Sequence, residues 1–299
     1  MGKNVKIKRG LDIALEGQPE NNVYSVDSPA TFAVKPKDFK GLIPKLNVKQ
    51  GDEVKAGDCL FTDKGNNSIC FTSPVSGEVA EIVRGDRRAI MEVKILADSE
   101  VSYKSFDTSG YATKSRQEVK DLMLEAGLWP FIVQRPFGVL ADTDVEPKAI
   151  HVSGFDSAPL AADLDITLKG EEANLKVGFE ILKKLTDGVV HLNLHAKKSK
   201  EVYAQVSGVE INTIDGPHPS SLVGVQINKI DPINKGDVVW TVKPQHVAFI
   251  GKFFATGTLN LEQTIVVAGS EFKTPAYYKT RLGAAVNTLV DGNLKQDNV

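Results

Sequence analysis

The feature that most constrains the fold is a change of sequence pattern near residue 100. Before it, short apolar segments alternate with glycine-containing turns, as at Val48–Val54 and Ser73–Gly77. After it, segments with helical spacing alternate with short apolar runs. The first pattern is typical of antiparallel β structure, and the second of strand–helix units. We therefore predict a multidomain α/β protein whose N-terminal part is all-β.

The length of the chain also argues for several domains. A chain of 299 residues is too long for one compact core of usual size. We place an all-β domain at residues 1–98 and an α/β domain at residues 99–260. Residues 261–299 begin a third unit that is too short to close a core alone.

Local signals predict the helices and strands of the α/β domain. Ser115 and Glu118 form a capping box, and Gly127 stops that helix. Pro244 opens a further helix that ends at Gly257. The remaining expected elements are a helix over 171–185 and strands at Ala149–Ser153, Val189–Leu194 and Thr264–Ala268.

Composition excludes several functional classes. The 36 basic and 38 acidic residues nearly balance, so we expect no nucleic-acid partner. Two cysteines, Cys59 and Cys70, cannot supply the thiolates of an iron–sulfur cluster. No stretch approaches the roughly 18 apolar residues of a membrane span. Any association with a membrane must therefore come through a partner.

Motifs for catalysis, metals and phosphates are weak. His191 and His195 are four residues apart, but they fall in a predicted strand without acidic neighbours. No glycine triplet follows a strand, and no Ser-His-Asp or Cys-His arrangement stands out. We assign no catalytic residue, metal ligand or cofactor-binding residue to this chain.

The N-terminal domain resembles the lipoyl and biotinyl carriers, which are barrel-sandwich hybrids. The resemblance rests on Val48–Val54, Gly57–Phe61 and Ser73–Val79, with Lys64 placed after Asp63 as the modified lysine is in carriers. Gly65-Asn66-Asn67 lengthen the hairpin tip beyond the carrier pattern. We favour a carrier-like fold with a solvated lysine over a modified one.

Residues Leu122–Gly138 resemble the start of the FMN loop in the NADH-oxidising subunit of respiratory complex I and in the C subunit of the Rnf complex. In those relatives glycines let the backbone approach the flavin phosphate. Here Trp129, Pro130 and Phe131 stand at that place, and such side chains block close approach. We expect an inherited fold without the FMN and NADH sites.

Several segments together resemble the A subunit of the sodium-translocating NADH:quinone oxidoreductases. They are Ile7–Asp12, Phe71–Gly77, Gly127–Trp129, Arg135–Phe137, Asp215–Pro219 and Arg281–Gly283. The resemblance implies a peripheral subunit on the cytoplasmic face of the bacterial inner membrane, in a complex that passes electrons from NADH to quinone and exports sodium. It implies FAD or FMN and the iron–sulfur centre in partner subunits, none in this chain, and a final segment that begins a β-grasp-like (ubiquitin-like) domain.

Five residues are candidates for binding the quinone that this resemblance implies. Trp129, Phe131 and Phe137 offer aromatic rings, Arg135 a donor fork, and His218 a donor on a turn. The competing interpretation is that the rings fill the cavity left by a lost flavin and that His218 is a structural turn residue.

Three functional classes follow. The first is a cofactor-free subunit that contributes to quinone binding and assembly. The second is a flavin-dependent NADH dehydrogenase subunit, which flavin absorbance would support. The third is a lipoyl or biotinyl carrier, which a mass increase on Lys64 would support.

Overall fold

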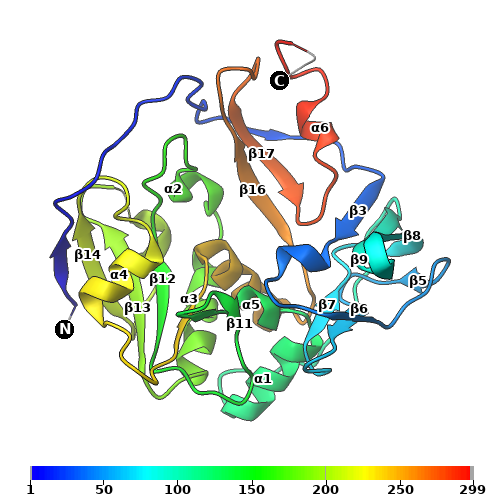
Figure 1. The fold of residues 1–299 in the computed structure, drawn as a ribbon, viewed down its shortest axis with the longest axis horizontal. Coiled ribbons are helices and arrows are strands. Elements are labelled where there is room, and N and C mark those ends of the chain that lie inside the picture. Colours follow the sequence, from blue (N-terminus) through cyan, green and yellow to red (C-terminus); the bar gives the residue numbers. More distant parts are fainter. Residues whose placement is uncertain (1, 199, 297–299) are drawn as a thin grey trace.

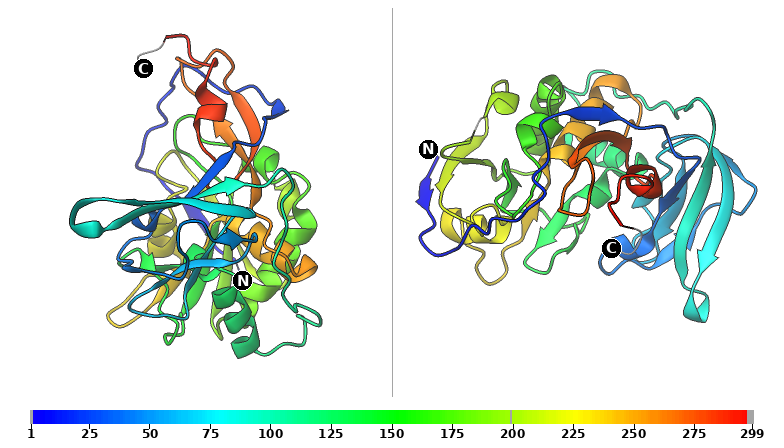
Figure 2. Two further views of the ribbon diagram at one scale, coloured as in Figure 1. Left: turned by 90° about the vertical axis from the view of Figure 1, so that its right-hand side faces the viewer. Right: turned by 90° about the horizontal axis from the view of Figure 1, so that it is seen from above.

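The computed structural model describes residues 2–198 and 200–296. A large sheet with its helices forms one side of the molecule, and two small sheets form the other side (Figure 1). A third small sheet, with the C-terminal residues, lies against the junction of these two parts (Figures 1 and 2).

The large sheet has seven strands in the order β1-β14-β13-β12-β15-β10-β11. The first five in this order are parallel, and β10 and β11 are antiparallel additions at one edge. The strands are β1 (Asn4–Lys6), β10 (Val133–Arg135), β11 (Val139–Leu140), β12 (Ala149–Ser153), β13 (Val189–His195), β14 (Glu210–Asp215) and β15 (Val239–Thr241). The helices of this part are α1 (Arg116–Glu125), α2 (Leu164–Thr167), α3 (Glu172–Lys184), α4 (Val223–Ile230), α5 (Pro244–Thr256) and the 3-10 helices η3 (Trp129–Phe131) and η4 (Glu201–Tyr203).

One face of the large sheet is apolar and packs on α3 and α5. Ile150, Val152 and Leu192 from the strands share a buried core with Phe179 of α3 and Ile250 of α5. This burial follows from the period of two in each strand, which sends alternate side chains to opposite faces.

Glycines allow α3 and α5 to touch backbone to backbone. A Cβ atom on Gly178 would lie 2.1 Å from the carbonyl oxygen of Val247. A Cβ atom on Gly251 would lie 1.7 Å from the carbonyl oxygen of Asn174. No side chain fits at either position, so the helices cross closer than they could with any other residue there.

The opposite face of the sheet is polar and carries α4. His151 and His191 stack with ring centroids 4.4 Å apart, and both are buried. Asn193 donates to Gln226 of α4 over 2.9 Å, and Asn212 donates to Asn193 over 2.9 Å. Burial lowers the pKa of His151 to about 3, so its imidazole is neutral.

The N-terminal part consists of two antiparallel sheets around an aromatic core. Phe61 and Phe71 stack with centroids 4.9 Å apart, and Phe39 meets Phe71 edge-on at 4.6 Å. Gly51 and Gly57 both have the positive φ that suits their glycine-containing turns. The sheets contain β3 (Thr31–Val34), β5 (Glu53–Val54), β8 (Gly77–Arg84) and β9 (Ile90–Ala97), and β4 (Pro44–Leu46), β6 (Cys59–Asp63) and β7 (Cys70–Thr72), with the 3-10 helices η1 (Pro36–Asp38) and η2 (Asp86–Arg88).

The first residues of the chain pair with strands outside the N-terminal sheets. β1 pairs with β14 in the large sheet, and β2 (Val23–Ser25) pairs with β17 (Ala276–Arg281). β16 (Glu262–Val267) completes that three-stranded sheet, beside which α6 (Asn287–Val290) lies. These pairings show that the N-terminal residues contribute strands to all three parts of the structure. The domain limits at residues 98 and 260 stay predictions, as does the β-grasp-like nature of the last segment.

The elements predicted from local signals are confirmed. Ser115 and Glu118 make both bonds of the capping box, and Gly257 ends α5 in the left-handed conformation. The strand at Ala149–Ser153 has the expected bounds, and the other predicted elements are displaced by one or two residues at their ends. In the described residues, no helix is long and apolar enough to cross a membrane.

The helix crossing gives a first prediction. Gly251→Ala should lower the free energy of unfolding by roughly 3 kcal/mol, because the new methyl group forces α3 and α5 apart. Gly224→Ala on α4 is the matched control, since a Cβ atom there has no neighbour within 4 Å. It should stabilise the chain by about 0.5 kcal/mol through helix propensity. Chemical denaturation measures both, and equal effects would contradict the account.

The buried His151 gives a second prediction, on pH. The pKa of His151 is lower in the folded chain than in the unfolded chain, so the unfolded chain takes up the extra proton as pH falls. Stability contributed by neutral His151 is therefore present above about pH 6.5 and declines below it. His151→Gln should lose this dependence. The amount by which the free energy of unfolding of the wild type exceeds that of the variant should therefore shrink by about 1.4 kcal/mol for each pH unit below pH 6. Parallel stability–pH curves for the two proteins would refute this.

Candidate functional site

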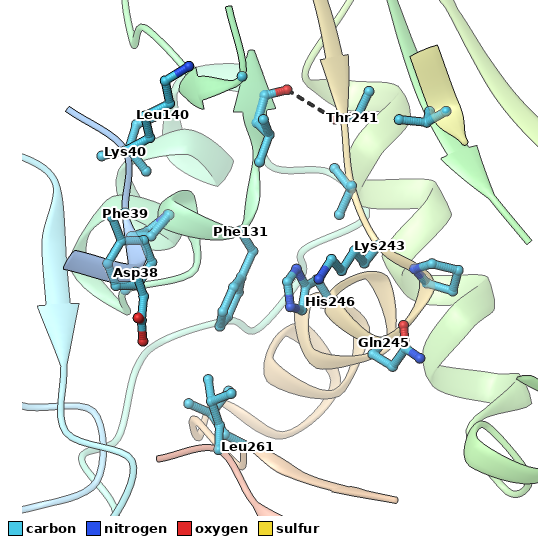
Figure 3. Close-up of a pocket in the computed structure, with 18 of the residues that line it drawn as sticks. Asp38, Phe39, Lys40, Phe131, Leu140, Thr241, Lys243, Gln245, His246 and Leu261 are labelled. Carbon is cyan, nitrogen blue, oxygen red and sulfur yellow. Dashed lines mark hydrogen bonds between the residues drawn. The ribbon is translucent and has the colours of Figure 1, made fainter. Parts of the chain in front are cut away.

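A cavity of about 720 Å³ lies between the N-terminal sheets and the large sheet. Its volume is in the range of sites that bind small molecules. β12 and β15 end at this cavity, and α5 begins there, which is where open α/β sheets bind ligands. Figure 3 shows Thr241 of β15 and Gln245 and His246 of α5 around one space with Phe131 and Asp38. The lining includes Asp38, Phe39, Phe71, Phe131, Arg135, Ser153, Asp156, Ser221, Thr241, Lys243, Gln245, His246 and Leu261.

The N-terminal part is fixed against the large-sheet part at this cavity. Thr72 of β7 donates its hydroxyl to the carbonyl of Ala126 over 3.2 Å. Gly127 follows with φ of +74°, and a Cβ atom there would lie 2.3 Å from the Thr72 hydroxyl. The end of α1 and β7 can meet only because residue 127 is glycine.

Aromatic rings form one wall of the cavity. Phe131 of η3 lies 4.3 Å from the His246 ring, with the two planes 30° apart. Phe249, one turn further along α5, lies 5.9 Å from Phe131. In Figure 3 the Phe131 and His246 rings face each other, with Phe39 on the other side of Phe131. Flat apolar surface of this kind suits a planar ligand.

Two polar atoms beside these rings have no partner. Arg135 Nε and His246 Nδ1 are buried and accept or donate no hydrogen bond within the described residues. Burial, and next the positive charge of Lys243, lower the pKa of His246. The imidazole is therefore neutral, with one donor and one acceptor nitrogen. Buried polar atoms without a hydrogen-bond partner cost free energy, so both nitrogens are exceptions to the usual pairing of buried polar groups.

A chain of hydroxyl groups continues from the cavity to His218. Ser221, which lines the cavity, donates to the Asp156 carboxylate over 3.2 Å. Ser157 donates to the Ser221 hydroxyl over 2.9 Å. His218 Nδ1 lies 3.1 Å from the Ser157 hydroxyl, and its backbone N–H donates to Asp12. His218 thus braces the cavity wall from behind and does not line the cavity.

The other predicted site residues separate into two groups. Phe131 and Arg135 line the cavity, as the quinone hypothesis requires. Trp129 is fully buried, donates to the carbonyl of Ala141 over 2.8 Å, and packs edge-on against Trp240. Phe137 is 72% exposed and lies outside the lining. Trp129 therefore lies in the core, as the interpretation that the rings fill an internal cavity expects.

Sequence reasoning missed the contribution of α5. Lys243, Gln245 and His246 lie at the start of this helix and line the cavity. Pro244 correctly marked the helix start, so the signal for a first turn was present. Nothing local indicated that this turn faces Phe131, which is more than a hundred residues away.

The hairpin that carries Lys64 is tied to the central part. Lys64 is exposed, and the side chain of Asn66, two residues on, donates to the Thr143 hydroxyl over 2.8 Å. A carrier lysine needs a free tip to visit its enzymes, so this contact weighs against the carrier interpretation. Within the described residues, no group of three or more His, Cys, Asp or Glu side chains could hold a metal ion.

Comparison with known families assigns every main segment of the chain. Residues 5–98 match the NqrA N-terminal barrel-sandwich hybrid domain. Residues 114–259 match the NqrA second alpha/beta domain, and residues 264–299 match the NQRA C-terminal domain. The barrel-sandwich hybrid and the α/β domain predicted from sequence are thereby confirmed.

Two curated relatives agree with these matches. The A subunit of the Na(+)-translocating NADH-quinone reductase of Neisseria meningitidis serogroup B is 35% identical over 97% of this chain and 65% of its own length. The protein of the same name from Glaesserella parasuis is 33% identical over 98% of this chain and 66% of its own length. A chain of an NAD+-reducing NiFe-hydrogenase superposes with a TM-score of 0.40 at 9% identity, over 64% of this chain and 42% of that chain.

The family therefore follows from three domain models in their order along the chain and from relatives matched over nearly its whole length. The chain spans about 65% of the length of the curated relatives it matches. It belongs to the NqrA family, the A subunits of the Na(+)-translocating NADH-quinone reductases.

Proposed function

We propose that this chain is a peripheral part of a sodium-translocating NADH:quinone reductase, and that the cavity beside Phe131 binds the quinone. The family membership supports the first statement, since the relatives are named as subunits of that reductase. In this proposal the chain lies on the cytoplasmic face of the bacterial inner membrane. Partner subunits carry FAD or FMN and the iron–sulfur centre, and this chain contributes to quinone binding and to assembly.

The observation that carries the quinone site is the pairing of an aromatic wall with the side chain of Arg135 in one ligand-sized cavity. A quinone headgroup is flat and has two carbonyl oxygens that accept hydrogen bonds. Phe131 supplies aromatic surface to the cavity, and the Arg135 guanidinium supplies a donor that is charged at all physiological pH values. Phe39 and Leu261 add apolar surface for the rest of the molecule.

The flavin-dependent alternative has less support in this chain. η3 (Trp129–Phe131) occupies the segment where the flavin relatives have glycines, and all three of its side chains are buried. Backbone N–H groups cannot approach a phosphate closely past such side chains. The carrier alternative is opposed by the contact between Asn66 and Thr143.

Membership in the complex is tested by co-purification. The tagged chain is recovered from gently solubilised membranes of its own host, and co-purifying proteins and NADH-driven quinone reduction are measured. Recovery with flavoprotein subunits and sodium-dependent activity supports the proposal. Recovery of the chain alone, in preparations where the rest of the complex is intact and active, would sink it.

The quinone site gives a third prediction, on binding. Arg135→Gln and Phe131→Ala should each weaken binding of a water-soluble short-chain quinone by about tenfold, through loss of a charged donor and of the ring surface. Titration calorimetry on the purified chain measures the dissociation constant. Phe137→Ala is the matched control, because its ring is exposed outside the cavity. If Phe137→Ala weakens binding as much as Phe131→Ala, the site is not this cavity.

A further inference from the structure

The β8–β9 hairpin projects from the N-terminal part and carries arginines at its tip. The strands Gly77–Arg84 and Ile90–Ala97 pair along their length, and the turn between them stands clear of the body in both views of Figure 2. Every residue from Arg84 to Ala89 is exposed. Three of these six residues, Arg84, Arg87 and Arg88, are basic, and Asp86 is acidic.

Three charged residues on the shaft of the hairpin, Glu81, Glu92 and Lys94, form ion pairs, whereas the arginines at its tip do not. Lys94 lies 2.9 Å from Glu81, and Lys35 lies 3.6 Å from Glu92. None of the three tip arginines forms an ion pair within residues 2–198 and 200–296. The tip therefore presents a net positive charge that no ion pair among the described residues compensates.

The backbone holds the tip in one unusual shape. Arg87 has φ of +55° and Arg88 has φ of +61°, a conformation that costs energy for residues with a Cβ atom. Gly85 donates its N–H to the Ala89 carbonyl over 2.8 Å, and the Arg84 guanidinium donates to the Arg88 carbonyl over 3.3 Å. Positive φ at both central residues is what a tight two-residue hairpin turn requires, and the side chains of Arg87 and Arg88 are exposed there.

We propose that this tip, Arg84–Ala89, is a docking surface for an acidic patch on a partner protein. Arginine binds carboxylates through two parallel N–H donors, so a tip of fixed shape selects a fixed arrangement of Asp and Glu side chains. A fluid lipid surface fits less well for two reasons. Basic segments that bind anionic lipid carry about four to eight Lys or Arg residues, and the tip has no large apolar or aromatic side chain to enter the interface.

The test uses the tagged full chain in membranes of its own host, and it rests on the proposed membership in a complex. Arg87→Asn with Arg88→Asn removes two charges while asparagine tolerates the left-handed conformation. Arg87→Lys with Arg88→Lys keeps the charge and loses the planar donor fork. Lys176→Gln with Lys229→Gln is the control, since it removes two exposed positive charges from α3 and α4.

The salt concentration that releases half of the chain from its co-purifying proteins is measured for each variant. The double asparagine variant should release at about half the wild-type concentration, because screened charge contacts are lost. The double lysine variant should lie between, and the control should match wild type. Unchanged release of the double asparagine variant overturns the docking proposal alone. A wild-type chain without any partner overturns both proposals.

Vesicles that contain phosphatidylglycerol test whether the tip binds an anionic lipid surface instead of an acidic partner protein. Wild-type chain should bind such vesicles no better than the double asparagine variant does. Vesicle binding that the asparagine substitutions abolish, together with unchanged release from partner proteins, would make the tip a lipid contact and contradict the proposal.

Discussion

The backbone contact between α3 and α5 is the constraint on which the rest of the structure depends. Gly178 and Gly251 leave no room for a side chain between the two helices, so the crossing has one depth and one register. The same crossing buries the apolar face of the seven-stranded sheet, and it fixes the direction of α5. Because α5 is fixed, Gln245 and His246 in its first turn line the same cavity as Phe131. The contact of Thr72 with the turn at Gly127 then positions the N-terminal sheets, which form the opposite wall of the cavity.

The two faces of the seven-stranded sheet differ in how they are stabilised. The apolar face supplies the cohesion of the central part, whereas the polar face organises buried groups in a hydrogen-bonded network from Asn212 to Gln226. Gln226 donates to Ser153 at the carboxyl end of β12, so the network reaches the wall of the cavity. Ser221 and Ser157 extend it to His218. These hydrogen bonds connect the cavity wall to the polar face of the sheet.

Local structure was readable from sequence, and long-range structure was not. The capping box at Ser115, the helix start at Pro244 and the strand at Ala149–Ser153 are set by neighbours within a few residues, and all were predicted. The pairing of β1 with β14 joins segments about two hundred residues apart, and no local signal announces it. The same limit applies to the candidate site. Phe131 and Arg135 were proposed for the chemistry of their side chains, and both line the cavity, whereas nothing local pointed to His246, which meets Phe131 from α5. Trp129, two residues from Phe131, turns into the core, and sequence could not separate the two rings.

The most direct test of the quinone site is a crystal structure of this chain with a short-chain quinone bound. We predict one ordered headgroup in the cavity, in contact with the Phe131 ring and with a carbonyl oxygen within hydrogen-bond distance of Arg135. An ordered quinone elsewhere on the chain, with this cavity empty, would contradict the account.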